Sequence, residues 1–117
     1  MSTSRLYHNP RCSKSREALA LLAENEINPT VVLYLEQTPS ADEISQLLAS
    51  LGFNDARQLM RKSEADYAAL GLDNPTLSQA ELIAVLATHP GLIERPVFCH
   101  QGRAVIGRPP ARVLEIL

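Results

Sequence analysis

The sequence predicts an α/β fold in which a four-stranded mixed sheet packs against helices. One observation is the order within residues 5–35, where an apolar strand, an amphipathic helix and a second apolar strand follow one another. That order is typical of a βαβ unit with parallel strands. Another is the order within residues 95–117, where two short apolar runs flank a turn and a last helix follows. With helical patterns between them, the expected order is βαβ, a helical block, then ββα.

The first unit begins with "RLYH" (5–8), a short strand that the turn-forming Asn9-Pro10 pair ends. An amphipathic helix is predicted from Cys12 to about Asn25, because its apolar residues recur with helical spacing: Ala18, Leu19, Leu21 and Leu22. The run "TVVLYL" (30–35) is β-branched and continuous, which predicts a strand buried on both faces.

The middle of the chain carries start and stop signals of helices. Ser40–Glu43 and Ser78–Glu81 both match a capping box, and Gly52 is expected to end the first of these helices. Between them we expect a short helix capped by Asn54 or Asp55 and one or two helical turns within 63–72; His89-Pro90-Gly91 closes the block.

The C-terminal pattern predicts a hairpin and a helix. "RPVFCH" (95–100) and "RAVIGR" (103–108) are joined by Gln101-Gly102, a two-residue turn that contains glycine. Pro109 and Pro110 suit the start of a last helix that ends in "RVLEIL".

Composition narrows the class of protein. The 117 residues, 45% of them hydrophobic, fit one ordinary domain, and a net charge of −2 gives no general attraction to nucleic acid or to an anionic membrane. No apolar run approaches the roughly 20 residues of a membrane span, and the N-terminus lacks the long apolar stretch of a signal peptide. Two cysteines are too few for a disulfide framework, so we expect the reducing cytoplasm. We also expect a monomer.

Cys12 stands where the first helix begins, which is the main indication of chemistry. A helix N-terminus offers unpaired backbone N–H groups and the positive end of the helix dipole, and both favour a thiolate. Arg11, Lys14 and Arg16 add positive charge, and His8 just upstream could orient or deprotonate the thiol. Such a setting makes a cysteine nucleophilic at neutral pH. The alternative is an inert, half-buried thiol.

Ser15 follows Cys12 at the position where a C-x-x-C motif would have its second cysteine. A redox-active Cys12 therefore needs a partner thiol from glutathione, a glutaredoxin or a thioredoxin. The hydroxyl of Ser15 either binds the thiolate or caps the helix. Cys99 lies within a predicted strand and is interpreted as a small buried hydrophobic residue.

Three arginines are candidate anion ligands. Arg95 and Arg108 each precede a proline at the end of a predicted strand, which restricts them to an extended conformation, and Arg61 lies in "QLMRKSE". Guanidinium groups bind tetrahedral oxyanions through several fixed donors. Alternatively, each is a solvated surface residue. No zinc, metalloprotease or P-loop motif occurs, so we expect neither a metal nor a bound cofactor.

Four stretches together resemble the glutaredoxin-dependent arsenate reductase family, which also contains the Spx regulators: "YHNPRCSKSR", "LMRKSEADYAALGL", "IERPVF" and "IGRPPARVLEIL". The resemblance runs along the whole chain in the right order. It implies one thioredoxin-like domain over 1–117 with a helical insertion at about 40–90. It also implies a cis peptide bond between Arg95 and Pro96.

The resemblance implies a role for each matched residue. Cys12 corresponds to the nucleophile, and the oxyanion ligands are Arg61, Arg95 and Arg108, which should converge on Cys12. The neighbourhood consists of His8, Asn9, Ser15, Arg11 and Pro96. The implied reaction reduces arsenate to arsenite through a covalent adduct on Cys12, with glutathione as reductant and glutaredoxin as partner.

Two other functions stay open. An Spx-like regulator would bind RNA polymerase, but such regulators usually carry C-x-x-C where this chain has C-x-x-S. A thiol reductase with another substrate is also open, because Arg11 and Lys14 stand where arsenate reductases often have small residues. The chain also ends at "VLEIL", without the C-terminal extension of longer members.

Overall fold

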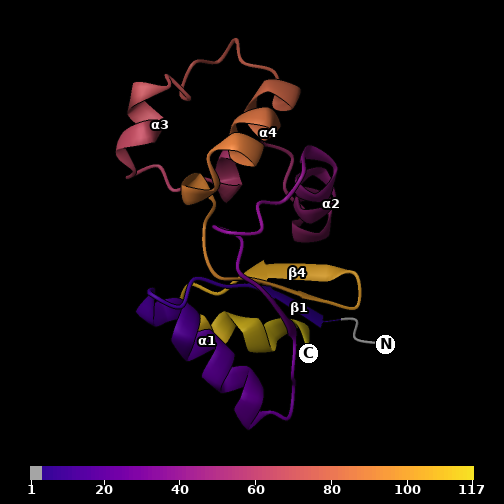
Figure 1. Ribbon diagram of the computed structural model, residues 1–117. Helices are drawn as coiled ribbons and strands as arrows, with labels where there is room; N and C mark the ends of the chain where they lie inside the picture. Colours follow the sequence, from indigo (N-terminus) through magenta and orange to yellow (C-terminus); the bar gives the residue numbers. More distant parts are fainter. Residues whose placement is uncertain (1–3) are drawn as a thin grey trace. The chain divides into compact units, whose positions relative to one another are not determined.

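The computed structural model describes residues 4–117. The chain forms two units, one of Met1–Gln37 with Arg95–Leu117 and the other of Thr38–Glu94. The first contains the sheet and the helices packed on it, and the second contains the helical block (Figure 1). Among the helices of residues 4–117, none is long and apolar enough to span a membrane.

The first unit is built on a four-stranded sheet in the order β2-β1-β3-β4. Its strands are β1 (Ser4–Tyr7), β2 (Thr30–Val32), β3 (Val97–His100) and β4 (Arg103–Ile106). β1 pairs with β2 in parallel and with β3 antiparallel, and β3 pairs antiparallel with β4. The mixed sheet predicted from the sequence is confirmed.

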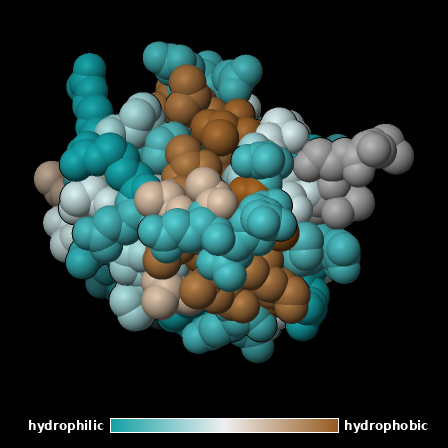
Figure 2. Space-filling view, turned by 90° about the horizontal axis from the view of Figure 1, so that it is seen from below, coloured by the Kyte–Doolittle hydropathy of each residue, from teal (hydrophilic) through white to brown (hydrophobic). Residues whose placement is uncertain are grey.

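Two helices cover one face of this sheet, α1 (Ser13–Glu24) and the 3-10 helix η3 (Pro110–Ile116) (Figure 1). The core between them joins Leu6, Phe98 and Val105 of the strands to a helical set of Ala18, Leu22, Val113 and Ile116. Burying such side chains is the main stabilising contribution to the fold. Seen from this side, Figure 2 shows apolar patches separated by hydrophilic side chains.

The prediction for residues 30–35 is wrong in extent and burial. β2 ends at Val32, and Val31 is 40% exposed. The physical reason is that β2 lies at the edge of the sheet and pairs only with β1. The chain then turns at Leu33, whose carbonyl accepts from the N–H groups of Glu36 and Gln37. The β-branched run therefore predicts a strand correctly, but it does not show whether that strand is central or at the edge of the sheet.

The predicted hairpin turn is present at Gln101-Gly102, where both residues have positive φ, of 50° and 82°. Two consecutive positive φ values match the tight turns that suit the twist of a hairpin. The last helix also follows the prediction, with Pro110 at its start, although it winds as a 3-10 helix.

The Thr38–Glu94 unit contains five short helices, α2 (Ala41–Leu51), η1 (Ala56–Leu59), α3 (Ala65–Ala69), α4 (Gln79–Thr88) and η2 (Pro90–Leu92). Their ends follow the predicted signals. Ser40 accepts from the N–H of Glu43, Gly52 ends α2 with φ of 75°, Asp55 caps η1, and Ser78 with Glu81 forms a full capping box.

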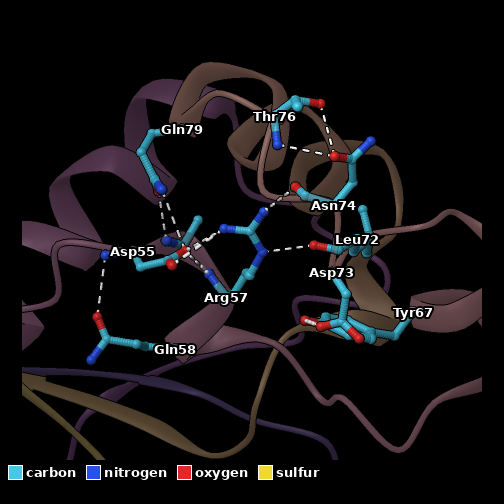
Figure 3. A network of polar contacts seen from close by, with 10 residues as sticks. Asp55, Arg57, Gln58, Tyr67, Leu72, Asp73, Asn74, Thr76 and Gln79 are labelled. Atoms are coloured by element: carbon cyan, nitrogen blue, oxygen red, sulfur yellow. Dashed lines mark hydrogen bonds and ion pairs between the residues drawn. The ribbon is translucent and has the colours of Figure 1, made fainter.

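A polar network centred on Arg57 connects the segments of this unit (Figure 3). The guanidinium of Arg57 donates through Nε to the Leu72 carbonyl at 2.6 Å and through Nη2 to the Asn74 carbonyl at 2.7 Å. Its Nη1 pairs with the Asp55 carboxylate at 3.3 Å. Each guanidinium nitrogen thus has an acceptor, and the loop over 72–74 is fixed to η1.

Candidate active site at the start of α1

The loop between β1 and α1 is a hydrogen-bonded turn. The N–H of His8 donates to the Val32 carbonyl at 2.9 Å, which extends the pairing of β1 with β2. The Asn9 carbonyl then accepts from the N–H of Cys12 at 3.0 Å, and the Asn9 side chain accepts from the N–H of Arg11 at 3.0 Å. Pro10 occupies the second turn position, which its fixed φ favours. The turn places Cys12 directly before the first residue of α1.

Cys12 is the N-cap residue of α1, with extended backbone angles of −95° and 121°. The backbone N–H groups of Ser15 and Lys14 and the guanidinium of Arg95 lie near its sulfur, although the Cys12 side chain accepts no cap hydrogen bond from the helix. Burial raises the pKa of Cys12, but the Ser15 N–H, the Arg95 guanidinium and the Lys14 N–H together outweigh this and lower the pKa below its usual value. The shift has the direction that the helix start predicts.

The source of the positive charge is not the predicted one. Arg11, Lys14 and Arg16 were expected to favour the thiolate through their side chains, yet the guanidinium that contacts the sulfur belongs to Arg95. Lys14 contributes its backbone N–H. Arg16 donates from Nη1 to the Pro10 carbonyl at 2.9 Å. All three local side chains are exposed, so water screens their charges more than that of the half-buried Arg95.

His8 and Ser15 form a buried pair beneath the loop. Nδ1 of His8 lies 2.6 Å from Oγ of Ser15, and that oxygen also accepts from the N–H of Asn9 at 3.1 Å. Burial, followed by the nearby charge of Arg16, lowers the pKa of His8. The Ser15 hydroxyl is therefore engaged by His8 and Asn9, and the sulfur is reached instead by the Ser15 backbone N–H.

Arg95 comes to Cys12 from the segment before β3. The Arg95–Pro96 peptide bond is cis, as predicted. Burial works against the charge of the guanidinium, but its contacts with Cys12 and with the Tyr34 phenol outweigh this and raise the pKa of Arg95. Within residues 4–117, Nε of Arg95 is buried without a hydrogen-bond acceptor. A buried donor of this kind is one that an anion's oxygen can satisfy.

Arg108 lies next to the Arg95 backbone. The Arg108–Pro109 bond is also cis, and Nη1 of Arg108 donates to the Arg95 carbonyl at 3.0 Å. The preceding Gly107 donates to the Pro96 carbonyl at 2.9 Å, and a Cβ there would lie 2.9 Å from the Pro96 ring. The close approach of these two segments thus requires glycine at position 107.

Arg61 belongs to the Thr38–Glu94 unit, where it forms ion pairs with Glu64 and, through Nε at 3.7 Å, with Glu94. Its convergence with Cys12 stays a prediction. The structure brings together Cys12, Arg95, Arg108, His8, Asn9, Ser15 and Pro96 within the other unit.

Tyr34 is a neighbour of this site that the sequence did not reveal. The sequence places it within a predicted buried strand, and no local motif distinguishes a tyrosine that packs in a core from one that lies beside an arginine. The turn at Leu33 was the feature that periodicity missed.

A pocket of about 250 Å³ opens beside the loop and is lined by His8, Asn9, Pro10, Arg11, Leu33, Leu35 and Glu36. It combines an apolar wall with one cation and one anion, a mixture suited to a small polar molecule that has an apolar part. Among residues 4–117, no group of three or more His, Cys, Asp or Glu side chains could hold a metal ion. The chemistry that the geometry offers is that of a thiolate nucleophile beside a guanidinium.

Comparison with known proteins gives matches over nearly the whole chain. Residues 7–116 match the ArsC family. The chain is 50% identical over 112 residues to an arsenate reductase of Haemophilus influenzae, covering 96% of this chain and 97% of that protein. It is 43% identical to an arsenate reductase of Neisseria meningitidis serogroup B over the full length of both. The structure of the arsenate reductase from Vibrio cholerae superposes with a TM-score of 0.96, at 48% identity and full coverage of both chains.

Proposed function

We propose that this chain, which belongs to the ArsC family, reduces arsenate to arsenite through the thiolate of Cys12. The observation that carries the proposal is the position of Cys12 as N-cap of α1, where the Arg95 guanidinium lies close enough to lower the pKa of the thiol. It supplies a nucleophile whose pKa is lowered, which favours the thiolate, and a cation where an anion would react. Relatives named arsenate reductases, at 50% and 43% identity, support the choice of arsenate.

The first step joins Cys12 to the substrate. The thiolate attacks arsenic and forms an S–As bond, while one arsenate oxygen takes up protons and leaves as water. Arsenic stays pentavalent in this adduct. The attacking group and arsenate are both negatively charged, so a guanidinium beside the sulfur lowers the repulsion between them. Arg95 is placed to do this, and Arg108, held on the Arg95 carbonyl, would add a second positive charge.

Reduction requires a second thiol. We propose that glutathione attacks the Cys12 sulfur of the adduct, so that the S–As electron pair passes to arsenic. Arsenite leaves, and a mixed disulfide remains between Cys12 and glutathione. Glutaredoxin then transfers the glutathionyl group to itself and restores the thiolate. An external thiol is needed because Ser15 stands where a resolving cysteine of a C-x-x-C motif would stand.

The role of Arg61, which the sequence predicts, and the use of the pocket are further parts of the proposal. Arg61 would bind an arsenate oxygen only by exchanging contacts with Glu64 and Glu94, since both carboxylates pair with it here. The pocket beside Arg11 and Glu36 is a suitable approach for glutathione, which carries carboxylates and an ammonium group. The reaction needs a reducing compartment, so we place the protein in the cytoplasm, acting as a monomer and without a bound cofactor.

A coupled assay tests the function. The purified chain is mixed with arsenate, glutathione, glutaredoxin, glutathione reductase and NADPH, and oxidation of NADPH is followed. We expect consumption that depends on arsenate, on glutaredoxin and on Cys12. If NADPH is consumed at the same rate without arsenate, the chain is not an arsenate reductase, and the substrate of Cys12 has to be sought elsewhere.

A further inference from the structure

The pocket beside the loop of Cys12 carries two opposite charges that are not paired within the described chain. Arg11 lines it from the loop before α1, and Glu36 lines it from the turn after β2. Both side chains are exposed, and within residues 4–117 neither the guanidinium nor the carboxylate has a hydrogen-bond or ion-pair partner. The guanidinium of Arg16, by contrast, donates to the Pro10 carbonyl. The charges of Arg11 and Glu36 are therefore available to a ligand.

Backbone hydrogen bonds fix the two segments that form this pocket. The N–H of His8 donates to the Val32 carbonyl at 2.9 Å, which joins the end of β1 to the end of β2. Beyond these strand ends, the N–H of Arg11 donates to the Asn9 side chain at 3.0 Å. The N–H of Glu36 donates at 2.9 Å to the carbonyl three residues earlier. Each charged residue is thus held in a turn by its own backbone, and the pocket is formed before a ligand binds.

The remaining wall of the pocket is mainly apolar. Pro10, Leu33 and Leu35 line it, and Leu35 is 45% exposed although it is a large hydrophobic residue. The volume of about 250 Å³ is slightly below the roughly 300–1,000 Å³ of typical small-molecule sites, so it suits one end of a small molecule. An α-amino-acid group on a short hydrocarbon arm has the matching chemistry, a carboxylate and an ammonium group next to an apolar stem.

The position of Cys12 adds a requirement on length. In the part of the chain that the structure describes, Cys12 does not line the pocket, although its neighbour Arg11 does. A molecule held there has to extend beyond the pocket to react with the Cys12 sulfur. In cysteine the thiol lies directly beside the amino-acid group, whereas in a γ-glutamyl peptide of cysteine a longer arm separates the two. The pocket therefore fits the longer kind of thiol.

We infer that this pocket binds the α-amino-acid end of the thiol that attacks Cys12, with its carboxylate on Arg11 and its ammonium group on Glu36. The two residues then determine which thiols are accepted. The inference rests on the proposed function for the need of an external thiol, since Ser15 stands where a second cysteine of the motif would stand. It adds a binding site and a chemical class for that thiol.

The test follows thiol exchange at Cys12 and needs no arsenate. In the C99S protein, dithiodipyridine converts Cys12 to a mixed disulfide with thiopyridine, an uncharged group. An added thiol forms a disulfide with the Cys12 sulfur, and its proton leaves with the released thiopyridone, whose absorbance gives the rate. The thiols are glutathione, cysteine and mercaptoethanol, which has no charged end.

We expect R11Q and E36Q each to slow glutathione roughly two- to fivefold relative to mercaptoethanol, which is the range of one solvent-exposed charge contact. Cysteine should keep its rate relative to mercaptoethanol, because it is too short to use the pocket and Cys12 together. The ratio to mercaptoethanol removes any general change in the reactivity of Cys12.

Two analogues of glutathione test each charge separately. Glutaryl-cysteinylglycine lacks only the ammonium group of the γ-glutamyl end, and 4-aminobutanoyl-cysteinylglycine lacks only its carboxylate. E36Q should not slow the first analogue and R11Q should not slow the second, because the partner group is already absent.

The matched controls are K14Q and E17Q. Lys14 and Glu17 are exposed at the start of α1 and are not among the described residues that line the pocket. These variants remove the same charges near Cys12, so they should leave the ratio of the glutathione rate to the mercaptoethanol rate unchanged.

The outcomes separate this inference from the proposed function. An unchanged ratio in R11Q or in E36Q, an equal loss with cysteine, or an equal loss in the control variants would overturn the assignment of the pocket. The expected losses together with no consumption of NADPH that depends on arsenate would overturn the proposed function and leave the pocket as a thiol-binding site, since the exchange does not involve arsenate.

Discussion

Arg57 and Arg95 are both half-buried arginines, one in each unit of the chain, and their surroundings differ in kind. The guanidinium of Arg57 faces two backbone carbonyls and a carboxylate, and each nitrogen has an acceptor (Figure 3). Arg95 faces a thiol and a phenol, and its Nε is buried without an acceptor in the described chain.

The difference indicates what each arginine does. A guanidinium whose donors are all satisfied contributes to stability, because removing it leaves its acceptors unpaired. A guanidinium held beside a nucleophile, with a donor left over, has its charge available for a ligand. Since burial and charge are similar for the two, we propose that the identity of the partners separates a structural arginine from a functional one.

The strongest test of this comparison removes the partner of Arg95. C12S should abolish arsenate reduction while the protein stays folded, since serine is similar in shape but a poor nucleophile at neutral pH. The coupled NADPH assay measures the loss, and circular dichroism checks the fold. C99S is the matched control, because Cys99 in β3 is the other cysteine of the sequence and should be dispensable. If C12S kept a turnover near that of the wild type, Cys12 would not be the nucleophile.

The next test removes each arginine in turn, because the two variants should have different effects. R95A should lower kcat/KM roughly ten- to a hundredfold, as expected for loss of a charge-assisted contact of about 1.5–3 kcal/mol, and should raise the pH midpoint of Cys12 alkylation. R57A should instead lower the free energy of unfolding by about 1–3 kcal/mol, because it leaves the Leu72 and Asn74 carbonyls without their donor.

Both variants are measured by urea unfolding and by alkylation. A reversed outcome, in which R57A moves the midpoint and R95A only destabilises, would show that partner identity does not distinguish the two roles. R95K is an informative intermediate, since it keeps the charge but lacks the planar fork of donors.

The sequence predicted most of the fold, and the reason is visible in particular residues. Ser40, Gly52 and Ser78 act through local backbone geometry, so their helix ends could be predicted from neighbouring residues alone. The position of β2 at the sheet edge depends on strand order, which the local pattern of 30–35 does not contain. The contact of Tyr34 with Arg95 joins residues 61 positions apart and could not be predicted from spacing.

The candidate site shows the same division. The helix start at Cys12 was predicted, because the dipole and free N–H groups belong to the helix itself. The charged partner of the sulfur was assigned by resemblance to a distant arginine and by proximity to nearby basic residues. The structure favours the distant one, since the nearby side chains extend into solvent.

A smaller effect on Cys12 is expected from S15A, which alters the hydrogen bonds of the loop before α1 and leaves both arginines in place. S15A removes a fully buried hydroxyl that contacts Nδ1 of His8 and the N–H of Asn9. We expect a loss of about 1–3 kcal/mol in the free energy of unfolding, since the buried His8 ring and the half-buried Asn9 N–H both lose their partner. Alkylation of Cys12 should persist, because the backbone N–H of residue 15 is retained. Urea unfolding measures the stability, and alkylation at pH 7 measures the reactivity of Cys12. If S15A lost as much thiol reactivity as R95A, the Ser15 side chain would matter for the thiol and not only for the stability of the loop.

The smallest effect concerns His8 and the pH dependence of stability. Its pKa is lowered in the folded protein, by burial first and then by Arg16, whereas an unfolded chain has a histidine pKa of about 6.5. Above pH 6.5 both states are neutral and the favourable contribution of neutral His8 is complete. As the pH falls below 6.5, the unfolded chain binds a proton first, so the free energy of unfolding decreases until the pH reaches the folded pKa. Urea unfolding from pH 7.5 to 5 should show this loss in the wild type. In H8N the asparagine amide can take the place of Nδ1 beside Ser15 and does not titrate. The free energy of unfolding of H8N should therefore depend less steeply on pH over the same range. The control is H89N, which removes a histidine at the end of α4 and should keep the pH dependence of the wild type. Equal slopes in the wild type and H8N would mean that the buried His8–Ser15 pair does not titrate differently in the folded and unfolded protein.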